Sequence, residues 1–409
     1  MKNNVRFDLS DYLIHFFRDI DMDGKNAIVL PEYMGWHTLI EGEFLSSALM
    51  LRAALRNGRL WATWSYRNAI RTIYGPDPAV CFTDMPISAF VESSRARHAR
   101  GEAMGEVALV FPKSAIRKLG AHPAIYGLSQ HVSDWPIGDG SEARIIPTEC
   151  LPLAEQYRYV SYNDSTDWTH EREWRWPCRV PAQVPAEDIT QWKEIPGLDF
   201  YELGITGIGA IVRTRAQAKL VVSDMLTKID NNVARPDTFS FVLITDDLPD
   251  PSALRDRDAL QSALLEATVD IGKYFEVDQR TRLHIDQQFE ALVLQVANSA
   301  PSPEDGEAGG CWLWLHDGTD TFTRMLLATG RAFASNNGRY LAELPEFSHS
   351  WNLSQREDMT KQLAELVREQ LEVPCGSFSV SDSLDPDVEP FHAEGHDHNI
   401  SYYNATWMY

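Results

Sequence analysis

The sequence contains little cysteine, less basic than acidic charge, and no long apolar run. Its 409 residues include five cysteines, which lie far apart and form no C-x-x-C pair. This pattern argues against a zinc ribbon and against a disulfide framework. No stretch approaches the roughly 20 apolar residues of a membrane span, and the first residues lack the apolar core of a signal peptide. We therefore expect a cytoplasmic protein that does not enter the membrane.

Acidic residues outnumber basic residues in the chain as a whole. The chain has 37 Lys and Arg against 59 Asp and Glu, a formal charge of −22. Such a charge argues against non-specific binding of nucleic acid or anionic membranes by the whole surface, although a local basic groove stays possible. Hydrophobic residues make up 44% of the chain and aromatic residues 11%, which predicts a sizeable core and excludes global disorder.

The charge is unevenly distributed along the chain. Residues 250–409 hold 27 acidic and 11 basic residues, a net charge of −16 against −6 for the preceding part. The change coincides with residues 248–252 (LPDPS), a proline-punctuated stretch that is typical of a linker. We predict a first domain over residues 1–247 and an acidic second domain over residues 253–409. The acidic charge suits docking to a basic protein partner.

Local patterns predict a mixture of strands and helices in both domains. In the first, we expect strands at residues 79–82, 106–111, 157–162, 173–177, 205–213 and 239–244, and helices at 44–57, 113–119 and 216–229. In the second, we expect helices at 258–274, 282–297, 322–333 and 354–371, and strands at 311–316, 339–344 and 377–381. Ser354 and Glu357 have the spacing of a capping box at the start of the last helix. The fold class is α+β, with an α/β or α+β second domain.

The segment EREWR (171–175) is the strongest candidate for chemistry. In a strand, Glu171 and Glu173 would project from one face and form a carboxylate pair, with Arg172 and Arg175 available to offset their repulsion. The alternative is a solvated, charged strand edge, which is common. The tryptophans on either side of the segment favour a functional role, because a purely solvated face rarely carries them.

A second group of polar and aromatic residues lies nearer the N-terminus. His37 and Thr38 offer hydrogen bonds to a ribose, while aromatic rings offer a stacking face and an arginine offers a phosphate contact. The rings are those of Trp61, Trp64 and Tyr66, and the arginine is Arg67 or Arg71. The alternative is a hydrogen-bonded core histidine and ordinary packing aromatics.

Three further features are expected to be structural. Cys81 lies between Val80 and Phe82, as a small buried residue does. Residues 19–24 (DIDMDG) match the first half of an EF-hand loop, but the position of the last calcium ligand holds Leu30. The histidines of residues 392–398 (HAEGHDH) would suit a metal-dependent hydrolase, although a polar acidic tail explains them as well. We predict no metal site.

Several motifs, taken in order, resemble a bacterial family. They are HT (37–38), LRNGRL (55–60), VCFTDMPI (80–87), GEVALVFPKSAIRKLGAHPAIY (105–126) and EREWR (171–175). Between about residues 36 and 243 the chain resembles AbiGi-type abortive-infection proteins of phage defence. These are similar in pattern to the DarT-like branch of ADP-ribosyltransferases, and the Glu-x-Glu is similar to the late motif of ADP-ribosylating toxins.

The resemblance implies an ADP-ribosyltransferase-like mixed sheet and NAD as the substrate, used without a metal. Glu173 would stabilise the ribosyl cation, and Glu171 would position the acceptor. His37, Thr38, Trp61, Tyr66 and one of Arg67 and Arg71 would bind NAD. The implied function is an NAD-consuming phage-defence effector, either an ADP-ribosyltransferase or an NAD glycohydrolase, with a protein or nucleic acid in a local groove as acceptor. The alternative is a non-catalytic antitoxin or regulatory binding protein on the same fold.

Overall fold

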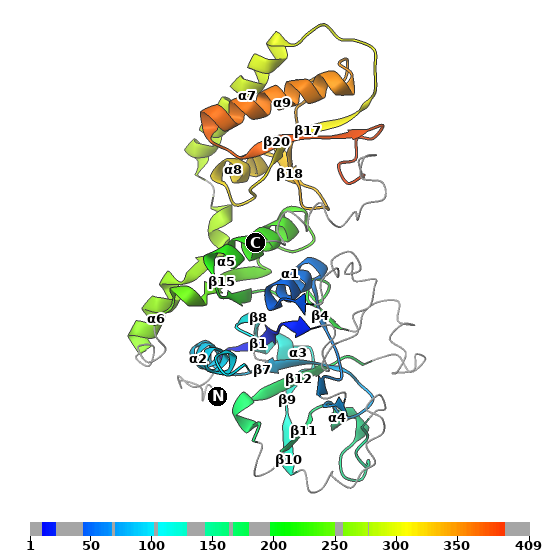
Figure 1. The fold of residues 1–409 in the computed structure, drawn as a ribbon, viewed down its shortest axis with the longest axis vertical. Coiled ribbons are helices and arrows are strands. Elements are labelled where there is room, and N and C mark those ends of the chain that lie inside the picture. Colours follow the sequence, from blue (N-terminus) through cyan, green and yellow to red (C-terminus); the bar gives the residue numbers. More distant parts are fainter. Residues whose placement is uncertain are drawn as a thin grey trace. The chain divides into compact units, whose positions relative to one another are not determined.

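A computed structural model gives the fold (Figure 1). It describes residues 10–21, 44–67, 70–101, 105–128, 144–162, 167–179, 197–249, 257–276 and 278–388. By their internal contacts these residues form two compact units. Unit 1 is Met1–Ala218 with Asp237–Val269, and unit 2 is Lys219–Pro236 with Asp270–Tyr409. The expected linker at residues 248–252 therefore lies within the chain segments of unit 1.

Unit 1 is built on an eight-stranded mixed sheet with the strand order β16-β15-β14-β8-β1-β7-β12-β9. Neighbouring strands are antiparallel from β14 to β9, whereas β14 and β15 are parallel. The strands are β1 (Tyr12–Phe17), β7 (Ala79–Thr83), β8 (Val107–Pro112), β9 (His122–Pro123), β12 (Glu173–Pro177), β14 (Ile208–Val212), β15 (Phe239–Ile244) and β16 (Thr268–Asp270).

Shorter elements complete unit 1. The small strand pairs are β2 (Ile20–Asp21) with β3 (Phe44–Leu45), β4 (Arg59–Trp61) with β13 (Gly197–Asp199), β5 (Tyr66–Arg67) with β6 (Ile70–Arg71), and β10 (Ile125–Leu128) with β11 (Tyr159–Tyr162). The α-helices are α1 (Ser47–Asn57), α2 (Ile87–His98), α3 (Lys113–Lys118), α4 (Leu153–Gln156) and α6 (Arg257–Glu266). Two 3-10 turns are η3 (Thr169–Glu171) and η5 (Thr245–Asp247). Helix α5 (Arg215–Asp230) begins in unit 1 and continues in unit 2.

Both faces of the large sheet are covered. Helices α2 and α6 pack on one face, where Phe90 and Ala263 join Ile14 and Val110 in one apolar cluster. On the other face Phe82, Phe111 and Phe200 form a chain of edge-to-face rings. Strands buried on both faces need no apolar–polar alternation. For that reason the central strand β1, with the sequence YLIHFF, was not predicted.

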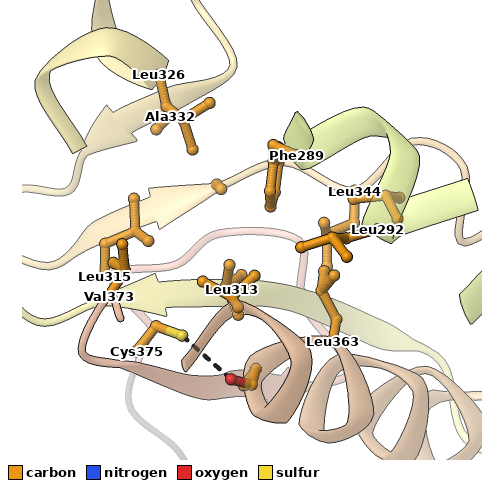
Figure 2. Close-up of a cluster of buried hydrophobic side chains, with 14 of the residues drawn as sticks. Phe289, Leu292, Leu313, Leu315, Leu326, Ala332, Leu344, Leu363, Val373 and Cys375 are labelled. Carbon is orange, nitrogen blue, oxygen red and sulfur yellow. Dashed lines mark hydrogen bonds between the residues drawn. The ribbon is translucent and has the colours of Figure 1, made fainter. Parts of the chain in front are cut away.

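Unit 2 has a four-stranded antiparallel sheet with helices packed on one face. Its order is β18-β19-β17-β20, from β17 (Gly309–Leu315), β18 (Ala332–Ala334), β19 (Tyr340–Ala342) and β20 (Cys375–Ser381). The helices are α7 (Gln279–Ser299), α8 (Thr321–Thr329) and α9 (Leu353–Leu371), preceded by the 3-10 turn η7 (Ile271–Phe275). Figure 2 shows Phe289 of α7 and Leu363 of α9 around Leu313 of β17, with the thiol of Cys375 donating to the carbonyl oxygen of Ala364.

The α+β class is confirmed, and most predicted elements are present within a few residues. Helix α9 begins with a different capping box from the expected one. Asn352 caps the backbone N–H of Gln355, whose side chain accepts from the backbone N–H of Asn352. The true N-cap is thus two residues earlier than Ser354. Among the helices that the structure describes, none is long and apolar enough to cross a bilayer.

Candidate functional site

The Glu-x-Glu segment lies where β12 pairs with β7. Glu173 is opposite Thr83 in the antiparallel register, and Arg175 is opposite Cys81. Residues directly opposite each other in such a pair share a face of the sheet. Thr83 also lies opposite Ile14, whose side chain packs in the cluster under α2. The candidate site is therefore on the α2 side of the sheet, close to its β12 end.

Glu171 does not lie on the strand as predicted. It ends the 3-10 turn η3, and Arg172 follows with φ of 50°, in the left-handed region. The hydroxyl of Thr83 donates to the Glu171 carbonyl oxygen at 2.6 Å, and the Asp84 N–H donates to the Arg172 carbonyl oxygen at 3.1 Å. These bonds fix the turn to the end of β7, so Glu171 enters the site from a turn and Glu173 from a strand.

The Glu173 carboxylate is held by a buried guanidinium. Arg175 donates from Nε to one carboxylate oxygen at 2.8 Å and from Nη2 to the other at 3.2 Å. Its Nη1 donates to the carbonyl oxygens of Tyr157 and Tyr159. Burial opposes the charged form of Arg175, but the charge and hydrogen bond of Glu173, together with Cys81 and Tyr126, raise the pKa of the guanidinium above its ordinary value. The Arg175 side chain is 5% exposed and that of Glu173 is 17%, so the glutamate is the more accessible member of the pair.

Glu171 has a separate cation. Arg97, near the C-terminal end of α2, donates to the Glu171 carboxylate at 2.8 Å. The sequence predicts Arg172 and Arg175 as the compensating cations; Arg175 pairs with Glu173, and Arg172 donates to Asp84. Arg97 is 74 residues from Glu171, so no local pattern identified it. One arginine cation for each carboxylate offsets the repulsion between the two negative charges.

Cys81 lies on the same face as the Glu173 carboxylate. Burial raises the pKa of the Cys81 thiol far above its ordinary value, and the hydrogen bond and negative charge of Glu173 add to this. The thiol therefore stays protonated and is unsuited to nucleophilic attack. Cys81 was expected to be a small buried residue; the structure has it half-buried and packed against the cluster of Trp64.

Asp84 forms a charged network on the opposite face of the same strands. Its carboxylate accepts from Lys113 at 2.6 Å, Arg172 at 2.9 Å and the Trp174 ring N–H at 3.1 Å. Asp84 is 6% exposed, and a buried carboxylate needs such partners. This network anchors Arg172, the residue between the two glutamates. The sequence motif VCFTDMPI contains Asp84, but no local pattern predicts this role for it.

The proposed NAD-binding residues are only partly described by the structure. His37 and Thr38 lie outside the described residues, and for Tyr66 and Arg67 only the backbone pairing of β5 with β6 is described. Trp61 is partly exposed on β4. Arg71 is buried, with its guanidinium 4.4 Å from the centre of the Trp64 ring.

Trp64 is a core residue. It is 1% exposed and packs with Ile73, Ala79 and Tyr157, against which Cys81 also packs. Because Cys81 lies opposite Arg175, this aromatic cluster lies next to the Glu173 face. The structure thus brings Trp64 near the carboxylates but leaves its ring no open face for stacking.

The structure describes no set of three or more His, Cys, Asp and Glu side chains that could hold a metal among the residues it covers. The histidines at 392–398 lie outside those residues. Asp19 belongs to the segment that matches the first half of a calcium loop. Its carboxylate accepts a hydrogen bond from the backbone N–H of Ser47 at 2.7 Å. That contact gives Asp19 a role in joining β2 to the start of α1.

Comparison with known proteins adds one match. A family model described as "Protein of unknown function (DUF4427)" matches residues 280–405, under a third of the chain and all in the second part of the sequence. The chain matches no curated protein and no solved structure. The matched residues include α7, α8 and α9 with the sheet of unit 2, and none of the candidate site.

Proposed function

We propose that the protein consumes NAD, as an ADP-ribosyltransferase or an NAD glycohydrolase, with Glu173 as the catalytic carboxylate. The observation that carries the proposal is the Glu173 side chain. It is held by a bidentate, buried Arg175, and 17% of the side chain is still exposed. A second carboxylate, Glu171, has its own arginine, and the charges of both glutamates act on Cys81 and Tyr126. Fixed charge aimed at a reacting centre is the most effective form of electrostatic catalysis.

The proposed chemistry follows from these two carboxylates. The bond between nicotinamide and C1′ of the ribose breaks with positive charge building on the sugar. Glu173 would stabilise that charge and accept a hydrogen bond from the ribose 2′-hydroxyl. Glu171 would position or deprotonate the acceptor, which is water in a hydrolase and a protein or nucleic acid in a transferase. Glu171 is the more exposed of the two carboxylates, with 26% of its side chain accessible. A residue that contacts the acceptor needs such exposure.

Other residues complete the proposal by resemblance to AbiGi-type and DarT-like proteins. His37 and Thr38 would hold the NAD ribose and amide groups, with Trp61 and Tyr66 beside the ring. Arg67 or Arg71 would contact the phosphates. The same resemblance proposes phage defence as the biological role. The net charge of −16 on residues 250–409 favours a basic protein as the partner of that part of the chain.

One observation favours a non-catalytic alternative. Each glutamate already forms an ion pair in the structure, as structural carboxylates do. A regulatory or antitoxin protein that binds a partner through this surface would need no more than that. The two functions differ in a single outcome, which is whether NAD is cleaved.

The test uses the full chain and NAD labelled separately in the nicotinamide and in the adenylate part. Release of labelled nicotinamide by the purified protein supports NAD cleavage. Label passing from the adenylate part to macromolecules only when cell lysate is added would identify a transferase. If nicotinamide release equals the buffer blank both with and without lysate, the enzymatic proposal is wrong and the binding alternative is favoured.

A further inference from the structure

The hydroxyl of Tyr126 lies against the backbone of Glu173. Tyr126 is on β10, which pairs in parallel with β11, and its phenol oxygen accepts the backbone N–H of Glu173 at 3.0 Å. This bond places the phenol at the same strand position as the carboxylate that the proposed function uses. The side chain is partly exposed, and the charges of Glu173 and Glu171 both act on the phenol.

The Tyr126 hydroxyl uses only part of its hydrogen-bonding capacity among the described residues. A tyrosine hydroxyl has one hydrogen to donate in addition to its acceptor capacity. The acceptor side is taken by Glu173, while among the described residues no acceptor is found for the hydrogen. Both oxygens of the Glu173 carboxylate accept hydrogen bonds from Arg175. The Tyr126 hydroxyl therefore keeps a hydrogen that it can donate to a ligand.

The protonation state of Tyr126 favours donation. Burial raises the pKa of the phenol above its ordinary value. The backbone hydrogen bond from Glu173 lowers this pKa, while the negative charges of Glu173 and Glu171 raise it further. The hydroxyl is therefore neutral at physiological pH and retains its hydrogen. A phenol donor next to a carboxylate acceptor matches a sugar hydroxyl, which is both donor and acceptor.

We propose that Tyr126 is a further substrate-contacting residue, whose hydroxyl donates a hydrogen bond to the oxygen of the same ribose hydroxyl that donates to Glu173. This inference rests on the proposed function, because it takes NAD as the ligand. It adds a specificity element, since the phenol and the carboxylate together recognise the 2′-hydroxyl rather than only the positive charge.

The test compares Tyr126→Phe with the wild-type protein on NAD and on an NAD analogue that lacks the 2′-hydroxyl of the nicotinamide ribose. Phe keeps the ring and removes the donor. We expect kcat/KM for nicotinamide release from NAD to fall about tenfold. The analogue should lose little by the same substitution, so the preference of the wild type for NAD should shrink by a similar factor. Each loss is the ratio of variant to wild-type kcat/KM on the same substrate. The different intrinsic reactivities of NAD and the analogue therefore do not affect the comparison.

The matched control is Tyr201→Phe, which removes a phenol that already donates to the Leu55 carbonyl oxygen in unit 1. This variant should keep the wild-type kcat/KM. An unchanged kcat/KM in Tyr126→Phe, with wild-type NAD cleavage intact, overturns the inference and leaves the proposed function standing. An equal loss on NAD and on the analogue also overturns it, because a purely structural effect does not depend on the 2′-hydroxyl. A wild-type protein that neither binds nor cleaves NAD overturns both proposals.

Discussion

An enclosed ion pair in unit 2 differs from the two partly exposed ion pairs of the candidate site in unit 1. In unit 2, Arg324 and Asp230 form a bidentate pair in which both side chains are 7% exposed, and Tyr340 donates to the same carboxylate. In unit 1, Glu171 and Glu173 have arginine partners and yet remain 26% and 17% exposed. A fully enclosed pair serves to fix the structure. A pair whose anion is open on one side also has the capacity to meet a ligand.

Breaking the enclosed pair gives the largest expected effect on stability. Asp230→Asn leaves the Arg324 guanidinium buried without its counter-ion, and we expect a loss of about 3–5 kcal/mol in the free energy of unfolding. The control is Asp358→Asn, which removes an exposed pair with Lys361 and should cost about 0.5 kcal/mol or less. Chemical denaturation of both variants measures the difference. Equal losses would show that enclosure does not distinguish the pair in unit 2.

A pH dependence of unit 1 is the second expected effect. His15, with Nδ1 2.8 Å from the Cys81 carbonyl oxygen, has its pKa lowered by burial to about 4. The unfolded chain, with the ordinary pKa near 6.5, then binds more protons than the folded one between these values. Stability should fall as the pH drops from about 6.5 to 4, by on the order of 1–3 kcal/mol.

The variant His15→Gln keeps a hydrogen-bond donor but does not titrate in this range. Its stability should vary less with pH than that of the wild type in urea unfolding at pH 7 and pH 5. His316 in unit 2 is shifted in the same direction by burial and by Arg368, so a residual slope is expected in the variant. If the wild type and the variant lose equal stability between the two pH values, His15 is not a source of the dependence.

The smallest predicted effect separates the two carboxylates of unit 1. Glu171→Gln should lower the transfer of ADP-ribose to an acceptor about tenfold while leaving nicotinamide release within a few-fold of the wild type. The reason is that Glu171 is the acceptor-side residue in the proposed chemistry and Glu173 is not. The two rates are measured on the same samples with doubly labelled NAD. A parallel fall of both rates would remove the division of roles.

Local signals in the sequence predicted the elements whose causes are local. The helix at 44–57 follows from apolar spacing and Gly58, and the structure shows α1 with a Ser46 cap and a left-handed Gly58. The EWRWP strand is also present as β12. Helix α2 was missed, because its N-cap is Pro86 without a side-chain cap and its sequence has little amphipathic pattern.

The candidate site was only partly predictable for a related reason. The sequence identified Glu171, Glu173 and Arg175, which are close along the chain. It identified neither Arg97 nor Tyr126, because only the pairing of distant strands and the placement of α2 bring these beside the glutamates. The left-handed Arg172 likewise depends on the contact with the end of β7, and this is what removed Glu171 from the strand.

The central claim is that the open Glu173 carboxylate acts on NAD. Its most direct test is the rate of nicotinamide release by Glu173→Gln beside the wild type and Glu155→Gln, a control that alters another arginine-paired glutamate of unit 1. Loss of the charge should lower the rate by about 100-fold or more, with the melting temperature close to that of the wild type and the control fully active. Wild-type nicotinamide release by a folded Glu173→Gln would contradict the account.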